Sequence, residues 1–508
     1  MEKTNKAVFK DYKQDQMVLL PPSLEELIPY NHPVRVVNKI ISEIDLTPLL
    51  KKYKGGGTSS FHPRMMMKVI VYAYVSNMYS SRKMEAALKE NIHFMWLSGM
   101  NMPDHNTLNR FRSERLKNML KEVFARVVEM LMNNGHLRIE EVYTDGTKIE
   151  ANANRYTYVW GKAVSNNKER MEKQLKELWE YAESVAREEL KDQTPTTFAP
   201  IDPEQVKQTI EKIDNALAGK PISKEVKTKL KHARKNWPKQ AKQYKEHEDN
   251  LAGRNSYSKT DTDATFMRMK EDHLGNGQLR AAYNVQVSSN DQYIVNYSIH
   301  QNPGDTGTLS AHLESFKKTY GIMPETVVAD AGYGSEQNYK MLEDNGVHAY
   351  IKYPTFYREQ QKNKNPFLTE NLRYNKEEDC YYCPKGERME KTGEDSRTTV
   401  NGFTQSLHGY QAQNCQGCAL KSSCYQAQGN RTIWISHKLR EYKEKIRADL
   451  QSPKGIFYRK KRGWDVETVF ANIKQNKNFK RFMLKGLQKV EIEFGLIAIA
   501  LNLKKVAG

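Results

Sequence analysis

Two aspartates stand where a strand delivers a carboxylate to the edge of a sheet. Residues 325–339 read ETVVADAGYGSEQNY, in which apolar β-forming residues lead into Asp330 and the chain then turns through Gly332 and Gly334. The upstream stretch LRIEEVYTDGTKIEA has the same character, with Asp145 in an expected strand that turns at Gly146. Either aspartate alone could be a turn cap, so it is the repeated setting that favours chemistry.

Two neighbouring carboxylates have a definite electrostatic requirement. Without a cation they repel each other, and one of them takes up a proton near neutral pH. A bound divalent metal removes the conflict, and carboxylate oxygens suit Mg²⁺ or Mn²⁺. Two such ions about 4 Å apart can assist both the attacking and the leaving oxygen of a phosphoryl transfer. Asp145 and Asp330 therefore predict a metal site for phosphodiester chemistry, which needs a third acid.

The candidate third acid is Glu467, in the stretch YRKKRGWDVETVFANIKQNKNFKRFMLKG at 458–486. On helical spacing, the buried face comprises Trp464, Val466, Val469, Phe470 and Ile473. Glu467 and Lys474 are seven residues apart and share another face, where a metal ligand and a phosphate-binding cation would serve one site. A surface acid and a surface base explain the spacing equally well. Asp465 is a rival third acid, although a cap near the helix start also explains it.

The surrounding elements must bring these acids together. Further strands and helices are expected in QLRAAYNVQVSS, QYIVNYSIHQ, DTGTLSAHLESFKKTYG, SEQNYKMLEDNG and VHAYIKY. Without residues 155–265 and the cysteine region, the order is strand-strand-strand-helix-strand-helix-strand. That order is compatible with an α/β, ribonuclease H-like core. The first and fourth strands are neighbours in such a sheet, so Asp145 and Asp330 would meet.

Helices are expected on both sides of the first strand. The N-terminal part contains the basic stretch NTLNRFRSERLK, which suits a helix-turn-helix-like DNA reader or a plain structural bundle. Between 166 and 247, alternating three- and four-residue apolar spacing predicts coiled-coil-like helices, one of them starting at Asp202 and Pro203. The third of these helices is strongly basic, which indicates a solvated face or a DNA contact.

These patterns divide the chain into six segments. The expected segments are an N-terminal helical DNA-binding or assembly domain (1–135), the first core strand (136–154), the helical insertion (155–265), the core (266–355), a Cys-rich insertion (356–435) and C-terminal helices with the third acid (436–508).

All five cysteines lie between 380 and 424. Cys380 and Cys383 form one C-x2-C pair, Cys415 and Cys418 form a second, and Cys424 is spare. Clustered cysteines in a cytosolic chain point to metal rather than to disulfides. We expect a structural, zinc-ribbon-like Zn²⁺ site with no open position for catalysis, with ordinary free thiols as the alternative.

The composition indicates a polyanionic partner. Eighty Lys and Arg against 61 Asp and Glu give a net charge of +19 over 508 residues, which favours nucleic acid over a membrane in the absence of a lipidation signal. The apolar runs MMMKVIVYAYV and FGLIAIALNL are shorter than the roughly 20 residues of a membrane span, and the N-terminus lacks a signal-peptide pattern. A cytoplasmic protein is expected.

The chain resembles the DDE transposases of bacterial insertion sequences, most closely the IS1182 group, over almost its whole length. The matching stretches are LIPYNHPVRVVNKIISEIDLTPLLKKYKGGGTSSFHPRMMMKVIVYAY, SSRKMEAALKENIHFMWLSG, PDHNTLNRFR, TDGTKIEANANRYTYVWGK, DTDATFMRMKED, ADAGYGSEQNY and VETVFANIK. The resemblance implies a ribonuclease H-like catalytic core with Asp145, Asp330 and Glu467 as the DDE triad.

The chain departs from its relatives at two places. Many carry Tyr-x2-Arg-x3-Glu-x6-Lys around the third acid, whereas here Gly463 occupies the arginine position and Arg462 comes one place earlier. Relatives also tend to have a cysteine near Ala412. The zinc ligands would then be Cys383, Cys415, Cys418 and Cys424, with Cys380 as an alternative member.

The resemblance implies a transposase that binds terminal inverted repeats, cuts a phosphodiester at each end and joins the 3′-hydroxyls to target DNA, working as a homodimer on double-stranded DNA. Lys474 and Arg462 would contact DNA, and Arg155 and Trp160 would track the strand or pack under the insertion. The alternatives are a domesticated DNA-binding regulator and a metal-dependent nuclease without strand transfer.

Overall fold

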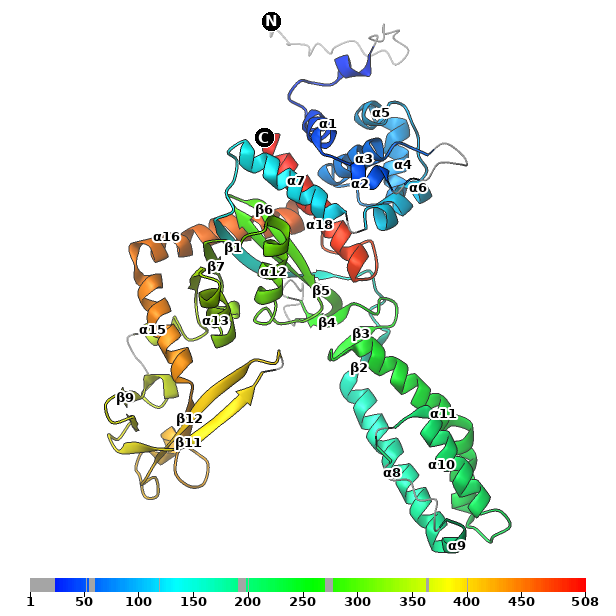
Figure 1. Cartoon of the computed structure of the whole chain (residues 1–508), viewed down its shortest axis with the longest axis vertical. Coiled ribbons are helices and arrows are strands. Elements are labelled where there is room, and N and C mark those ends of the chain that lie inside the picture. Colours follow the sequence, from blue (N-terminus) through cyan, green and yellow to red (C-terminus); the bar gives the residue numbers. More distant parts are fainter. Residues whose placement is uncertain are drawn as a thin grey trace, which may run out of the picture. The chain divides into compact units, whose positions relative to one another are not determined.

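The computed structural model describes residues 23–51, 53, 60–117, 119–190, 198–199, 201–269, 277–361, 365–399 and 401–508 (Figure 1). Its contacts divide the chain into two compact units, Met1–Phe111 with Leu503–Gly508 and Arg112–Asn502, and each is considered by itself. Within the described ranges, no helix is both long enough and apolar enough to cross a membrane.

The first unit is helical, with α3 (Pro63–Val75) as its most buried helix. The helix α1 (Pro33–Glu43) and α3 both begin with a His-Pro pair, in which Nδ1 of His32 or His62 accepts a backbone N–H at 3.2 Å. Arg64 Nη1 donates to the last carbonyls of α1, at 2.6 Å from Ile41 O. The other elements are η1 (Leu24–Leu27), α2 (Thr47–Leu50), α4 (Ser81–Glu90), α5 (Ile92–Ser98) and α6 (His105–Arg110).

The second unit contains a six-stranded sheet of order β4-β5-β1-β7-β8, with β6 also paired to β5. The strand β1 (Glu141–Glu150) lies between β5 (Leu279–Asn290), which is antiparallel to it, and β7 (Thr326–Ala329), which is parallel. Beyond β5 lie β4 (Thr265–Arg268) and β6 (Tyr293–His300), which both pair with it. Beyond β7 lies β8 (His348–Ile351). Thr144 pairs with Ala329, so the two acids that follow these residues stand at the same level of the sheet.

Helices connect and flank these strands. They are η2 (Phe111–Arg115), α7 (Leu120–Asn133), α12 (Leu309–Tyr320), η3 (Ala331–Tyr333), α13 (Glu336–Asp344), η4 (Arg358–Gln360), α15 (His437–Gln451), α16 (Pro453–Arg462), η6 (Gly463–Glu467), α17 (Thr468–Ala471), η7 (Asn472–Asn476) and α18 (Leu487–Val506). From Pro453 to Asn476 the helix is continuous, with π turns at η6 and η7. The contacts assign α7 to the second unit, whereas the sequence suggested an N-terminal domain that extends to residue 135.

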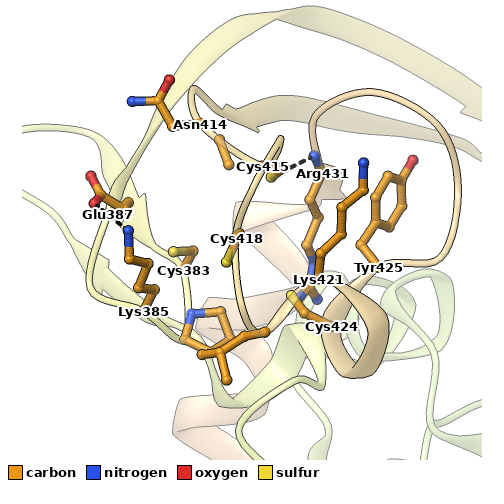
Figure 2. A pocket seen from close by; sticks show the side chains of 13 residues that line it. Cys383, Lys385, Glu387, Asn414, Cys415, Cys418, Lys421, Cys424, Tyr425 and Arg431 are labelled. Carbon is orange, nitrogen blue, oxygen red and sulfur yellow. Dashed lines mark hydrogen bonds and ion pairs between the residues drawn. The ribbon is translucent and has the colours of Figure 1, made fainter.

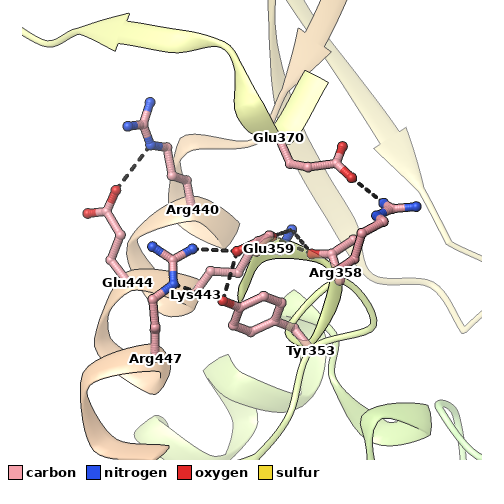
Figure 3. Close-up of polar contacts among 9 residues, drawn as sticks. Tyr353, Arg358, Glu359, Glu370, Arg440, Lys443, Glu444 and Arg447 are labelled. Atoms are coloured by element: carbon pink, nitrogen blue, oxygen red, sulfur yellow. Dashed lines mark hydrogen bonds and ion pairs between the residues drawn. The ribbon is translucent and has the colours of Figure 1, made fainter. Parts of the chain in front are cut away.

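A buried carboxylate fixes α15 to the loop that follows β8 (Figure 3). Glu359 accepts hydrogen bonds from Tyr353 Oη at 2.9 Å, from Thr355 Oγ1 and from Arg447 of α15. Burial alone would raise the pKa of Glu359, but these hydrogen bonds outweigh it and the pKa is lowered. The helix that precedes the helical run carrying Glu467 is thereby tied to the loop at the edge of the sheet.

The helical insertion has a core of its own. Its helices α8 (Gly161–Val185), α10 (Pro203–Ala216) and α11 (Lys224–Leu251) run alongside one another (Figure 1) and bury the expected seam, including Leu175, Ile210 and Trp237. Asp202 caps α10 and Pro203 is its first residue, as expected. The short α9 (Arg187–Leu190) and the β2–β3 pair (Tyr158–Trp160, Ser256–Ser258) complete the insertion.

The Cys-rich segment forms a separate five-stranded sheet of order β13-β12-β11-β10-β9. Its strands are β9 (Arg373–Asn375), β10 (Cys380–Tyr382), β11 (Arg388–Thr398), β12 (Thr404–Ala412) and β13 (Thr432–Ile435), accompanied by η5 (Thr369–Asn371) and α14 (Lys421–Cys424). Tyr381, Met389 and Tyr410 are central in its small core.

Candidate active site

Asp145 projects from the middle of β1. The sequence suggested that this strand turns at Gly146. Instead, the strand continues to Glu150. Gly146 is needed for a different reason, since a Cβ there would lie 2.3 Å from Gln286 Nε2 and 2.8 Å from Asp305 Oδ1. Close side-chain packing, rather than a bend, explains the glycine next to this acid.

Asp330 follows the last residue of β7 and has two roles. Its Oδ1 accepts a hydrogen bond from the backbone N–H of Ala331 at 2.7 Å, so it does cap the turn η3. Its Oδ2 lies 3.9 Å from Arg462 Nη2, and half of its side chain is exposed. The cap fixes the carboxylate without occupying both of its oxygens.

Arg462 joins all three predicted acids. Its Nη2 lies 2.8 Å from Asp145 Oδ2 as well as 3.9 Å from Asp330, and its Nη1 lies 3.1 Å from Glu467 Oε1. The Arg462 side chain is only 9% exposed, whereas the side chains of Asp330 and Glu467 are 50% and 60% exposed, so a buried guanidinium meets partly solvated carboxylates. Residues separated by more than 300 positions in the sequence thus meet at one guanidinium.

The π turn η6 places Arg462 and Glu467 on one face. In an α-helix, residues four apart align, whereas a π turn aligns residues five apart. Arg462 directly precedes η6 and Glu467 is its last residue, so the two are five apart and the turn accommodates one additional residue. The arginine that comes one place earlier than the resemblance implies therefore still reaches the acid.

Asp465 is a buried anchor rather than a helix cap. It lies in the middle of the helical run and is fully buried, with Oδ1 accepting from Ser289 Oγ at 2.6 Å and from the Gln292 N–H at 3.2 Å. Burial raises the pKa of Asp465. It thus fixes η6 to the end of β5 and to the turn that follows, while the 60% exposed Glu467 side chain faces Arg462.

The sequence suggested that Trp464 lies on the buried face of the helix, but it does not. Its side chain is 54% exposed, while Val466, Val469 and Ile473 are buried as expected. A π turn changes the rotation between successive residues, so a periodicity fitted to an α-helix misplaces a residue within the turn.

The other residues predicted to contact DNA are Arg155, Trp160 and Lys474. In the described part of the chain, Arg155 pairs with Glu150 at 3.3 Å, and Trp160 packs at the root of the insertion, 5.9 Å from the Phe266 ring. Lys474 is half-buried on η7. The structure brings Arg462 to the acids and gives Arg155 and Trp160 other partners.

Sequence reasoning missed a polar network beneath Gly146. Asp305 Oδ1 accepts from Asn284 Nδ2 at 2.8 Å and from Gln286 Nε2 at 3.1 Å, and the Tyr333 hydroxyl donates to Gln286 Oε1. Burial raises the pKa of Tyr333, which keeps this hydroxyl protonated. The available signal was the polar residues that alternate through the buried strand β5, whereas Asp305 follows no such pattern.

The donor chemistry of the three acids fits a divalent cation. Three carboxylates meet the guanidinium of Arg462 and the ammonium of Lys352, which lies 3.7 Å from Asp330 Oδ1, so the acids outnumber these two cations by one. Their oxygens are the hard ligands that Mg²⁺ prefers. Among the described residues, no three His, Cys, Asp or Glu side chains are already grouped to hold one ion. Arg462 lies between the acids, where it provides the positive charge.

Four cysteines line one small cavity in the Cys-rich segment (Figure 2). Cys383, Cys415, Cys418 and Cys424 surround a volume of about 30 Å³. Arg431 lies beside them, with Nη1 3.0 Å from Cys424 Sγ and its backbone N–H 3.3 Å from Cys415 Sγ. In the part of the chain that is described, these thiols are not close enough together to form a metal-binding group.

Cys380 belongs to a different environment. It is buried, and its thiol lies 3.7 Å from Glu378 Oε2. It does not line the cavity shared by the other four cysteines.

Two stretches of the chain match transposase families. Residues 382–507 match a transposase DDE domain, and residues 22–114 match a transposase domain designated DUF772. The first match includes Arg462, Glu467 and four of the five cysteines, but neither aspartate. A search of curated proteins found no match. The two matches are consistent with a DDE transposase and imply a transposase function with DNA as the partner.

Proposed function

We propose that the protein is the transposase of an insertion sequence of the IS1182 kind, which binds terminal inverted repeats and catalyses metal-dependent DNA cleavage and strand transfer. The observation that carries the proposal is the convergence of Asp145, Asp330 and Glu467 on the guanidinium of Arg462. The strand order, with β1 antiparallel to β5 and parallel to β7, supports a ribonuclease H-like core.

The three acids would hold Mg²⁺ or Mn²⁺, which supplies positive charge to the attacking and leaving oxygens of the phosphodiester. The protein orients its own groups for this task. The cap at Ala331 fixes Asp330, and the network of Gln286 and Tyr333 packs against β1 at Gly146. Arg462 sets the direction of the Asp145 and Glu467 carboxylates. Lys474 would hold a backbone phosphate on the same helical run.

The DNA-binding and assembly roles rest on charge and on the reaction. A net charge of +19 suits two DNA segments, the element end and the target. Joining two ends in one reaction requires two active sites, so the working form is proposed to be a homodimer on DNA. Arg155, which pairs with Glu150, and Trp160, which packs against Phe266, would act at the root of the insertion.

We further propose a structural Zn²⁺ bound by Cys383, Cys415, Cys418 and Cys424. The four side chains share one cavity, and four thiolates are a ligand set that zinc favours in structural sites. The location of Cys380 outside the cavity argues against it as a ligand.

The triad is tested by conservative substitution. Asp145→Asn, Asp330→Asn and Glu467→Gln should each abolish cleavage of end DNA in Mg²⁺, because each removes a carboxylate ligand at nearly constant size, and each should retain DNA binding. Asp465→Asn is the matched control, since it changes a carboxylate two residues from Glu467 that is buried against Ser289.

The outcomes separate the alternatives. If Asp465→Asn is inactive and Glu467→Gln is active, the third acid is Asp465 and the assignment of Glu467 is wrong. Binding without cleavage in the unaltered protein would support a domesticated regulator. Cleavage without joining of precut ends would support a nuclease.

A further inference from the structure

A buried arginine borders the cavity that four cysteines share (Figure 2). Arg431 directly precedes β13 and is only 5% exposed. Its Nη1 donates to Cys424 Sγ at 3.0 Å, and its Nη2 donates to the Phe367 carbonyl at 2.8 Å. Among the residues that the structure describes, no carboxylate forms an ion pair with this guanidinium. The group beside it that can carry a negative charge is therefore the Cys424 sulfur.

Arg462 shows how the chain compensates another buried guanidinium. Its side chain faces three carboxylates, whereas Arg431 faces sulfur and a carbonyl. An arginine keeps its proton in a protein, and a buried charge without an opposite charge is strongly destabilising. Glu387 is the only carboxylate among the described residues that line the cavity, but it is exposed and pairs with Lys385 at 3.4 Å. The cysteines must therefore supply the negative charge that Arg431 requires.

Main-chain hydrogen bonds hold Arg431 at the cavity. Its carbonyl accepts from the Ala412 N–H at 2.9 Å, and its own N–H donates to Cys415 Sγ at 3.3 Å. The adjacent Asn430 Oδ1 accepts from the Cys415 N–H at 3.1 Å. Arg431 thus contacts two of the four sulfur atoms, one through its backbone and one through its side chain. Because its backbone is bonded to the end of β12, the cation has a defined position beside the cysteines.

A zinc ion bound by four thiolates is an anionic complex, because the thiolate charges outnumber those of Zn²⁺. Groups around the ligands influence the affinity of a metal site, since they orient the ligands and tune their charge. We propose that Arg431 is the counter-charge of the zinc thiolates and positions Cys424 as a ligand. This inference rests on the proposed zinc site, to which it adds a residue that the spacing of the cysteines does not indicate.

The test separates the charge of Arg431 from its shape. Competition with a chromophoric chelator would measure the zinc affinity of the full-length protein, of Arg431→Gln and of Arg431→Lys. Arg431→Gln keeps an N–H donor but loses the charge, so it should bind zinc about 10- to 100-fold more weakly, the range typical of residues that support metal ligands. Arg431→Lys keeps the charge and should restore most of the affinity.

The matched control is Lys385→Gln, which removes an exposed cation from the lining of the same cavity. Its zinc affinity should equal that of the unaltered protein, because water screens a charge at an exposed position.

Equal zinc affinities of the unaltered protein and Arg431→Gln would overturn the proposal. Equal losses in Arg431→Gln and Arg431→Lys, or failure of both variants to fold, would also overturn it, because Arg431 would then be a packing residue. Failure of Arg431→Gln alone to fold, with zinc retained by Arg431→Lys, would support the proposal, since charge is then the deciding property. An unaltered protein that binds no zinc would refute the zinc site and this inference together, and the triad test would still stand because it measures cleavage.

Discussion

A single guanidinium organises the candidate active site at the scale of residues. Arg462 contacts Asp145, Asp330 and Glu467, which would otherwise repel one another in the absence of metal. Its guanidinium supplies positive charge to all three carboxylates, and Lys352 Nζ, 3.7 Å from Asp330 Oδ1, adds a second cation at one of them. A metal ion would supply the same kind of charge, so Arg462 and the metal are partly exchangeable electrostatically.

Because Arg462 and a metal ion would supply the same kind of charge, the effect of Arg462→Gln should depend on metal. In EDTA the variant should lose about 1–3 kcal/mol of unfolding free energy, because the carboxylates lose their shared cation. Addition of Mg²⁺ should reduce the difference from the unaltered protein. Denaturant unfolding with and without Mg²⁺ measures both effects, and Lys460→Gln on the same helix is the control. An equal loss in both buffers would show that Arg462 does not substitute for metal charge.

Residue types alone could not separate Glu467 from Asp465. Both are acids near the start of the same apolar pattern, and either could be a ligand. Their environments distinguish them, since Asp465 is fully buried against Ser289 and Gln292 while Glu467 is exposed beside Arg462. Ser289 lies 176 positions from Asp465, so no local signal could have indicated this contact.

At the scale of elements, β1, β5, β6, β7 and β8 and their order along the chain could be predicted, whereas β4 and the π turns could not. Apolar runs indicated β1 and β7, and their pairing brings Asp145 and Asp330 to one level. The helical spacing identified the buried face beyond Glu467 but misplaced Trp464, because contacts with the sheet, rather than local propensity, favour the turn η6. Gly146 was misjudged for a related reason, since its neighbours come from other elements.

The element-scale prediction concerns the four cysteines around one cavity. The protein purified without chelator should contain about one zinc per chain, and Cys415→Ser or Cys418→Ser should lose the metal and melt at lower temperature, because binding free energy of a structural site stabilises the fold. Elemental analysis and thermal unfolding measure this. Cys380→Ser is the control and should retain zinc, since Cys380 does not line the cavity. Metal-free protein with unchanged melting would identify the cysteines as ordinary thiols.

At the scale of the whole molecule, the helical insertion packs around a core of its own. Its buried cluster consists of residues from Met171 to Ala241 only, so its core is independent. The insertion also leaves and re-enters at one place, where β2 pairs with β3 and Lys168 Nζ lies 2.7 Å from Glu248 Oε1. An element that is separate in packing, and basic along α11, suits a role in assembly on DNA rather than in folding of the core.

Replacing residues 166–247 with a short Gly/Ser linker should therefore preserve a folded core that cuts single ends, but abolish paired-end complexes and concerted joining. A milder variant keeps the insertion and reverses its charge, Lys231→Glu with Lys235→Glu and Lys242→Glu, at three exposed positions of α11. Because these side chains lie outside the buried seam, the variant should fold normally and show the same assembly defect. Native gels of protein with labelled ends would follow the complexes, and a two-end joining assay would follow the reaction. Normal paired complexes in both variants would make the insertion a structural appendage, whereas a defect in the linker variant alone would assign assembly to its shape rather than to its charge.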